Sequence, residues 1–86
     1  MTSAALRQLI LEGLERSNVF SMRRHRGRAA FLQGTGDVEL DELDMDSLAR
    51  MELCIYIEAH TGIELTPAEL ERIKTLEGLA RELASR

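Results

Sequence analysis

Hydrophobic residues recur at helical spacing near the start of the chain, over residues 4–17. Such spacing predicts an amphipathic helix whose apolar face packs on a core. Polar residues between the apolar ones, Arg7 among them, fall elsewhere on this helix. We expect Ser3 to cap its start and Asn18 to end it, because Asn tolerates the left-handed conformation. The predicted inner face consists of Leu6, Leu9, Ile10, Leu14 and Ser17.

A second and stronger helical pattern covers residues 47–60. Asp46 can cap its first turn, and Gly62 supplies a left-handed residue after its end. The stretch Leu53 to Ile57 is apolar almost all round, which predicts a helix with neighbours on more than one side, near the centre of the fold. The positions at helical spacing are Leu48, Met51, Cys54 or Ile55, and Ile57 or Glu58.

Two shorter helices are predicted near the C-terminus, over residues 67–73 and 76–84. The segment Thr66–Glu69 begins the first of them with a threonine cap, a proline at the first helical position and a glutamate that completes a capping box. Thr75 caps the second helix. An i, i+3, i+4, i+7 stripe marks the inner face of that helix: Leu76, Leu79, Ala80 and Leu83.

No period holds between residues 19 and 45, where an arginine-rich run at 23–28 is followed by an acidic segment at 37–44. We expect a long loop here, with a short extra helix around residues 29–32 as an option. Scattered apolar residues would hold it to the domain: Phe20, Met22, Phe31, Leu32, Val38, Leu40 and Leu43. The pattern as a whole predicts an all-α fold, a small four-helix bundle with a long loop between helices one and two.

The length of 86 residues favours a single domain, residues 1–86, with little room for a large ligand cavity. A single cysteine excludes an internal disulfide. Because the sequence has neither a long apolar run nor a signal peptide, we expect a cytoplasmic protein without a membrane segment. Residues 1–36 carry a net charge of +4, whereas residues 37–86 carry −8. Such an acidic half disfavours nucleic-acid binding and suits docking onto basic partners.

Catalytic and metal sites find little support in the sequence. Ser47 and His60 lie thirteen positions apart on one helix, which separates them by about 20 Å and excludes a nucleophile with its base. Cys54 lies in an apolar run, where a buried and inert thiol is expected. His25 and His60 have no Cys or His partners at ligand spacing, so we expect no metal site. These residues therefore provide no catalytic arrangement that the sequence supports.

Ser47 itself stands at the first turn of a predicted helix, directly after a loop. There its hydroxyl would face water beside backbone N–H groups that lack partners within the helix. These donors and the helix dipole stabilise phosphate groups. The position suits a phosphodiester on Ser47, although a serine that merely assists capping explains the same residue.

From Leu40 to Leu83 the chain resembles the acyl carrier proteins. The attachment signature of that family is Asp-Ser-Leu at the head of a helix, found here as Asp46-Ser47-Leu48. The family pattern then continues without gaps through an acid–leucine pair, a later acid, a Gly-Ile-Glu-Leu-Thr-Pro-type link and an Arg-Ile-Lys-Thr-Leu segment. In this chain these are Glu52-Leu53, Glu58, Gly62 to Pro67 and Arg72 to Leu76.

The resemblance implies that Ser47 carries 4′-phosphopantetheine donated by coenzyme A through a separate phosphopantetheinyl transferase. The thiol of this arm would hold an acyl group as a thioester, and Asp46 and Leu48 would flank the attachment. The resemblance also implies that the protein itself is not an enzyme. Acyl-loading ligases, synthases or transferases would be the partners. The implied docking surface consists of Leu48, Glu52 and Glu58, together with Arg50.

Three features depart from the family pattern. Asp44 stands where the family usually has glycine, and Ala49 and Arg50 follow the signature where an acid is common, which indicates partners outside housekeeping fatty-acid synthesis. The third departure is the arginine run at 23–28. Three interpretations remain open for it: a solvated, mobile loop that can also pair with the acidic segment, a contact for an acidic partner or anionic substrate, and a nucleic-acid site.

The interpretation that we favour is a monomeric acyl carrier protein of a specialised fatty-acid, lipid or polyketide pathway. The alternatives are a stand-alone carrier of the aminoacyl or peptidyl type, and an unmodified helical interaction module. A binder of nucleic acid through the arginine run ranks last.

Overall fold

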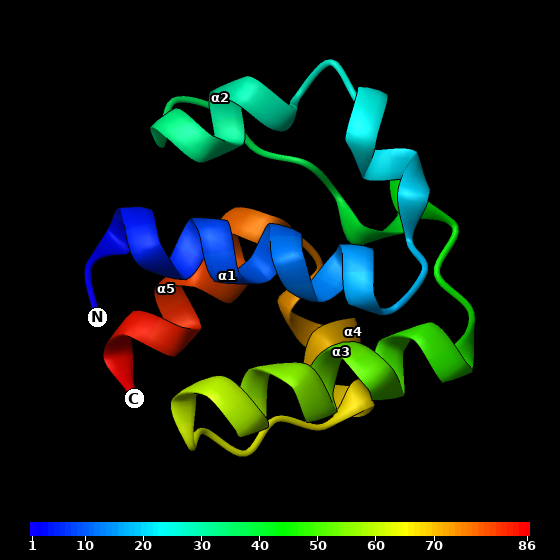
Figure 1. Ribbon diagram of the computed structural model, residues 1–86, viewed down its shortest axis with the longest axis vertical. Coiled ribbons are helices and arrows are strands. Elements are labelled where there is room, and N and C mark those ends of the chain that lie inside the picture. The colour runs from blue at the N-terminus through cyan, green and yellow to red at the C-terminus, as the bar shows by residue number, and fades with distance from the viewer.

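A computed structural model describes all residues from Met1 to Arg86 and shows an all-α fold without strands (Figure 1). The predicted fold class is thus confirmed, with one short helix more than the four predicted. No helix is both long and apolar enough to cross a bilayer. In chain order the elements are α1 (Ser3–Arg16), the 3₁₀ helix η1 (Phe20–Arg24), α2 (Arg28–Gln33), the 3₁₀ helix η2 (Leu40–Leu43), α3 (Ser47–Thr61), α4 (Pro67–Ile73) and α5 (Leu76–Ser85).

Helix α1 lies at the centre of the fold, with α2 on one side, α3 on the other and α5 behind it (Figure 1). The five positions predicted for its inner face are all buried. Its cap is Thr2, whose hydroxyl accepts the N–H of Ala5 at 3.1 Å, so the prediction of Ser3 was wrong by one residue. Asn18 follows the helix at φ 62°, in the left-handed conformation predicted for it.

Arg7 departs from the predicted pattern, because it is buried on α1 beside the apolar residues. Its guanidinium donates to both carboxylate oxygens of Glu77 on α5, and to the carbonyl of Phe31 on α2 at 3.0 Å. This ion pair keeps the pKa of the Glu77 carboxyl below its usual value, chiefly through the hydrogen bond from Arg7. A single buried cation therefore joins three helices.

The connection between α1 and α3 is structured, not an open loop. The extra helix considered around residues 29–32 is present as α2, which buries Phe31 completely. Farther along, the N–H of Leu40 donates to the carbonyl of Lys74 at 2.8 Å, and that of Leu76 donates to the carbonyl of Val38 at 2.9 Å. These bonds attach the connection to the link between α4 and α5. Phe20 is the exception among the predicted anchors, since 47% of it is exposed.

Helix α3 is less central than its sequence predicts. It packs mainly on α1 and α4, and only Leu53, Cys54 and Ile57 are buried. Ile55 lies in the same apolar run but is 59% exposed. The predicted neighbours on more than one side are present in α1 and α4, but the predicted central position was wrong: α1 occupies the centre, and α3 keeps one apolar face in water.

The predicted caps of α4 and α5 are confirmed. The Thr66 hydroxyl accepts the N–H of Glu69, whose carboxylate reaches back to the N–H of Thr66. Thr75 accepts the N–H of Gly78 at 2.9 Å and so begins α5. All four stripe residues of α5 join the core that α1 and α3 share. This core holds the start of α3 in place.

Candidate functional site

The first turn of α3 presents Ser47 to solvent. Asp46 precedes it in extended conformation, and its Oδ1 accepts the N–H of Ala49 at 2.7 Å, as predicted for a cap. The backbone N–H groups of Ser47 and Leu48 have no partner within the helix. An anion attached to the Ser47 hydroxyl would therefore meet free donors and the positive end of the helix dipole.

The segment that leads into α3 is fixed on the side of the core. Ser21 of η1 donates its hydroxyl to the carbonyl of Leu43 at 3.2 Å, and Met45 is 9% exposed. Asp44, which lies between Leu43 and Met45, adopts φ 51° and ψ 41°, in the left-handed region. The family's glycine at this position is explained by that conformation, which glycine adopts without strain and Asp tolerates. The departure at Asp44 therefore leaves the backbone of the site intact.

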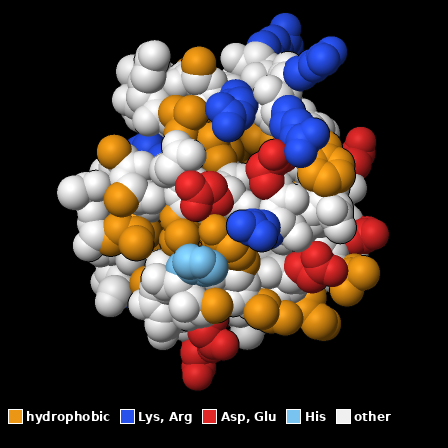
Figure 2. Space-filling model, in the orientation of Figure 1, with side chains coloured by type: hydrophobic (Ala, Val, Ile, Leu, Met, Phe, Trp, Pro, Cys, Tyr) orange, Lys and Arg blue, Asp and Glu red, His pale blue; other side chains and the backbone are white.

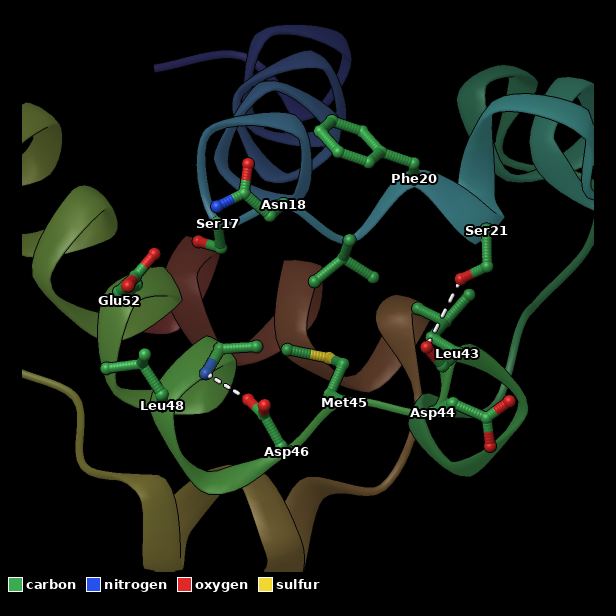
Figure 3. A pocket seen from close by; sticks show the side chains of 12 residues that line it. Ser17, Asn18, Phe20, Ser21, Leu43, Asp44, Met45, Asp46, Leu48 and Glu52 are labelled. Carbon is green, nitrogen blue, oxygen red and sulfur yellow. Dashed lines mark hydrogen bonds between the residues drawn. The ribbon is translucent and has the colours of Figure 1, made fainter.

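A cavity of about 350 Å³ opens beside the start of α3 (Figure 3). Its floor is apolar, formed by buried Val19, Leu43 and Met45. One wall comes from Asn18 of the α1–η1 link and Phe20 of η1, and the other from α3. No cationic side chain lines the cavity, whereas three carboxylates do: Asp44, Asp46 and Glu52. An apolar or amine-bearing group suits this lining better than a carboxylate does.

Along α3 an apolar stripe stays exposed, formed by Leu48, Met51 and Ile55 at 62%, 52% and 59%. Glu58 is exposed farther along the helix, and Glu52 is partly exposed. Figure 2 shows hydrophobic side chains next to acidic ones over this part of the molecule. Such a surface, apolar at its centre and acidic at its edge, can contact a partner that carries the opposite charge.

Arg50 lies apart from this stripe. Its side chain is 20% exposed and lines a groove between η2, α3 and α4. The structure therefore brings Leu48, Glu52 and Glu58 of the predicted docking surface to one solvent-facing side of α3, and places Arg50 on another side.

The arginines of the run at 23–28 form no ion pair with the acidic segment that follows them. Arg23 pairs instead with Glu15 of α1, at 2.8 Å from Nε to Oε2, and lies over the Phe20 ring. The one charged contact that the two segments can form joins His25 Nε2 to Glu42 Oε2 at 3.7 Å, and it is an ion pair only when the imidazole is protonated. Basic side chains gather at the η1–α2 end of the molecule in Figure 2. The pairing with the acidic segment that the first interpretation allowed is thus limited to His25 and does not involve the arginines.

Cys54 and the histidines offer no reactive group at this site. Cys54 is buried in the core, and burial raises the pKa of its thiol to about 11. His60 lies at the other end of α3, stacked on Tyr56 with ring centroids 4.1 Å apart. No three His, Cys, Asp or Glu side chains come close enough together to hold a metal ion.

Sequence reasoning missed several residues beside Ser47. Asn18, Phe20 and Met45 line the cavity, and Lys74 lines the groove that Arg50 faces. Local periodicity carries no signal for the contacts of Asn18, Phe20 and Lys74, because they join segments far apart in the chain. The exposed Ile55 did leave a signal, since α3 has more apolar residues than one buried face needs.

Comparison with known proteins adds one finding. A family model described as a phosphopantetheine attachment site matches residues 32–83, which include η2, α3, α4 and most of α5. The searches of curated proteins and of solved structures gave no match.

Proposed function

The chain belongs to the phosphopantetheine attachment-site family and is a phosphopantetheine carrier, and on this premise we propose that its arm is attached to Ser47. The observation that carries the assignment is the position of this serine, exposed at the first residue of a capped helix within the matched region. Other serines near the cavity have hydroxyls that donate to backbone carbonyls, Ser17 to Gly13 and Ser21 to Leu43.

The residues around Ser47 fit the phosphate of the arm. In the transfer, the Ser47 oxygen forms a bond to phosphorus while the pyrophosphate bond of coenzyme A breaks, releasing adenosine 3′,5′-bisphosphate and a proton. The capped first turn of α3 then stabilises the phosphodiester through the free N–H groups of Ser47 and Leu48. Once attached, the arm supplies the thiol on which an acyl group is carried as a thioester.

We assign the exposed stripe of α3 to docking of partner enzymes. Leu48, Met51 and Ile55 would enter an apolar depression on the partner, while Glu52 and Glu58 meet basic side chains at its edge. Charges at the edge of an interface raise association rates more than affinity, which suits a carrier that must leave each partner. The partners in this proposal are the transferase and the acyl-loading enzymes of a specialised fatty-acid, lipid or polyketide pathway.

One observation favours the alternative of an aminoacyl carrier. The cavity beside Ser47 is lined by three carboxylates without a cation, which suits a cargo that carries an ammonium group. Transfer of acetyl-, malonyl- and β-alanyl-phosphopantetheine from the corresponding coenzyme A esters to the chain would distinguish an acyl carrier from an aminoacyl carrier. A higher melting temperature with the β-alanyl group than with the acetyl group supports the aminoacyl alternative, and the reverse order supports the acyl carrier.

The primary test is incubation with coenzyme A and a broad-specificity phosphopantetheinyl transferase, followed by intact mass measurement. We expect the wild type to gain the mass of one phosphopantetheine. Ser47→Ala should gain none, whereas the matched control Ser85→Ala, at an exposed serine of α5, should be modified like the wild type. An unmodified wild-type chain, with a known carrier modified in parallel, would instead support the helical interaction module.

A further inference from the structure

A second hollow lies on the other side of the first turn of α3 from the cavity with the carboxylates. This groove has a volume of about 250 Å³ and lies between η2, α3 and α4. Unlike the first cavity it contains cations, Arg50 from α3 and Lys74 from the end of α4. The residues that line it are Leu40, Asp41, Arg50, Leu70, Glu71 and Lys74.

Arg50 has no strong anionic partner in the chain. The nearest carboxylate is that of Asp41, whose Oδ1 lies 3.7 Å from Nη2, beyond hydrogen-bond distance, and whose side chain is 94% exposed. A guanidinium has five N–H donors, and four fifths of this side chain is withdrawn from water. No buried side-chain nitrogen in the protein lacks a partner, so the unpaired nitrogens of Arg50 remain accessible.

The place of Arg50 on its helix is electrostatically unfavourable without an anion. It stands at the fourth residue of α3, where the positive end of the helix dipole disfavours a cation. Ser47 is three residues before it, and residues at that spacing have Cβ atoms about 5–6 Å apart on one side of a helix. A group attached to Ser47 therefore begins within reach of the guanidinium.

Lys74 lines the same groove from a backbone position that hydrogen bonds hold in place. It has φ 71°, its N–H donates to the carbonyl of Leu70 at 3.0 Å, and its own carbonyl accepts the N–H of Leu40 at 2.8 Å. Its side chain is exposed and takes part in no ion pair. Two cations, Arg50 of α3 and Lys74 directly after α4, thus line one hollow together with two carboxylates, Asp41 and Glu71.

We infer that Arg50, assisted by Lys74, binds the phosphodiester of the arm and holds the base of the arm over the groove between α3 and α4. The inference rests on the attachment of the arm to Ser47. Arginine suits this role because its planar fork binds two phosphate oxygens at once. The weak contact with Asp41 is then exchanged for a charge-assisted bond, and Arg50 acts as a positioning residue. The arm would leave Ser47 on the side away from the acidic cavity.

The test compares chains with and without the arm. Attachment should raise the melting temperature of the wild type by about 4 °C, the shift expected in a domain of this size for one modest interaction. In Arg50→Gln most of this increase should be lost, and in Lys74→Gln a smaller part. The matched control is Arg81→Gln, which removes an arginine that is 81% exposed on α5 and should leave the increase unchanged. The ³¹P chemical shift of the arm should move in Arg50→Gln and stay constant in Arg81→Gln.

Three results would distinguish the possible failures. If the arm attaches, as intact mass shows, but raises the melting temperature of Arg50→Gln and of the wild type equally, the inference is wrong and the proposed function stands. A chain that gains no mass refutes the proposed function and the inference together. Free coenzyme A, added without transferase, could raise the melting temperature of the unmodified wild type by the same amount and leave that of Arg50→Gln unchanged. This result would show a site for free phosphate groups and overturn the assignment to the arm.

Discussion

Helices α1 and α3 are of similar length and both are rich in apolar residues, yet they use these residues differently. In α1 the leucines and the isoleucine are buried, and the helix contacts α2, α3 and α5. In α3 one face joins the core while Leu48, Met51 and Ile55 remain in water. Apolar content alone therefore does not measure burial. What α3 leaves exposed lies beside Ser47, where a carrier would meet its partners.

The largest expected difference concerns one isoleucine from each helix. Ile10 of α1 is fully buried and Ile55 of α3 is 59% exposed. Truncating Ile10 to alanine should lower the free energy of unfolding by about 2–5 kcal/mol, because it leaves a cavity in the core. Ile55→Ala should change it by less than about 0.5 kcal/mol. Urea unfolding of both variants measures this, and equal losses would mean that α3 is as central as α1.

Glu77 tests how α1 is held at the centre. Its carboxylate pairs with buried Arg7, so Glu77→Gln should lower the free energy of unfolding by about 1–3 kcal/mol at neutral pH. Because the pair keeps the pKa of Glu77 low in the folded state, its stabilisation is present above the unfolded pKa. It is lost as the pH falls through the folded pKa. The difference between wild type and variant should therefore shrink in acid.

Unfolding curves at several pH values between about 6 and 3 provide the measurement. Glu64→Gln serves as the control, since Glu64 is exposed in the α3–α4 link and its carboxylate makes no ion pair. A difference between wild type and Glu77→Gln that stays constant with pH would show that the Arg7–Glu77 contact contributes little to the position of α1.

Ile55 should matter for docking where it does not matter for folding. Truncating a residue at the centre of an interface costs about 1 kcal/mol or more, so Ile55→Ala should lower the kcat/KM of the transferase for the chain about fivefold. Glu64→Ala, outside the stripe, should leave it unchanged. Equal kinetics for both variants at unchanged stability would remove the stripe from the docking surface of the transferase.

The parts of the fold that sequence predicts well depend on neighbours in the chain. Asp46, Thr66 and Thr75 cap helices within the next few residues, and each makes the predicted bond. Gly62 ends α3 at φ 74°, as its freedom to adopt positive φ implies. These signals are local, because both partners of each contact lie within one turn of helix.

Contacts between distant segments were not predictable in this way. Arg7 appears polar and exposed in the periodic pattern, and its burial depends on Glu77, seventy positions away. The candidate site divides in the same manner. Ser47 and its cap Asp46 follow from the tripeptide and the family resemblance. The cavity wall at Phe20 and the groove that Arg50 and Lys74 line form only when distant elements pack together.

The smallest expected effects arise where the chain leaves α1 and where it approaches α3, at Asn18 with φ 62° and Asp44 with φ 51°. Both residues hold a conformation that glycine adopts without strain. Asp44→Gly relieves that strain, but it also makes the unfolded chain more flexible, which lowers the free energy of unfolding by about 0.4–1 kcal/mol. We therefore expect the two effects on stability nearly to cancel. The Asp44 side chain makes no hydrogen bond or ion pair in the chain that this change would remove.

Asp44→Ala separates the two effects, because alanine keeps the Cβ that is crowded in the left-handed conformation, whereas glycine has none. We expect a loss of about 1 kcal/mol relative to Asp44→Gly, and a similar difference between alanine and glycine at Asn18. Thermal unfolding of the four variants measures it. Because Asp44 leads into the helix of Ser47, the alanine variant should also slow phosphopantetheine transfer, whereas Asn18→Ala should slow it less. Equal transfer by both alanine variants would mean that the backbone at Asp44 serves only the fold.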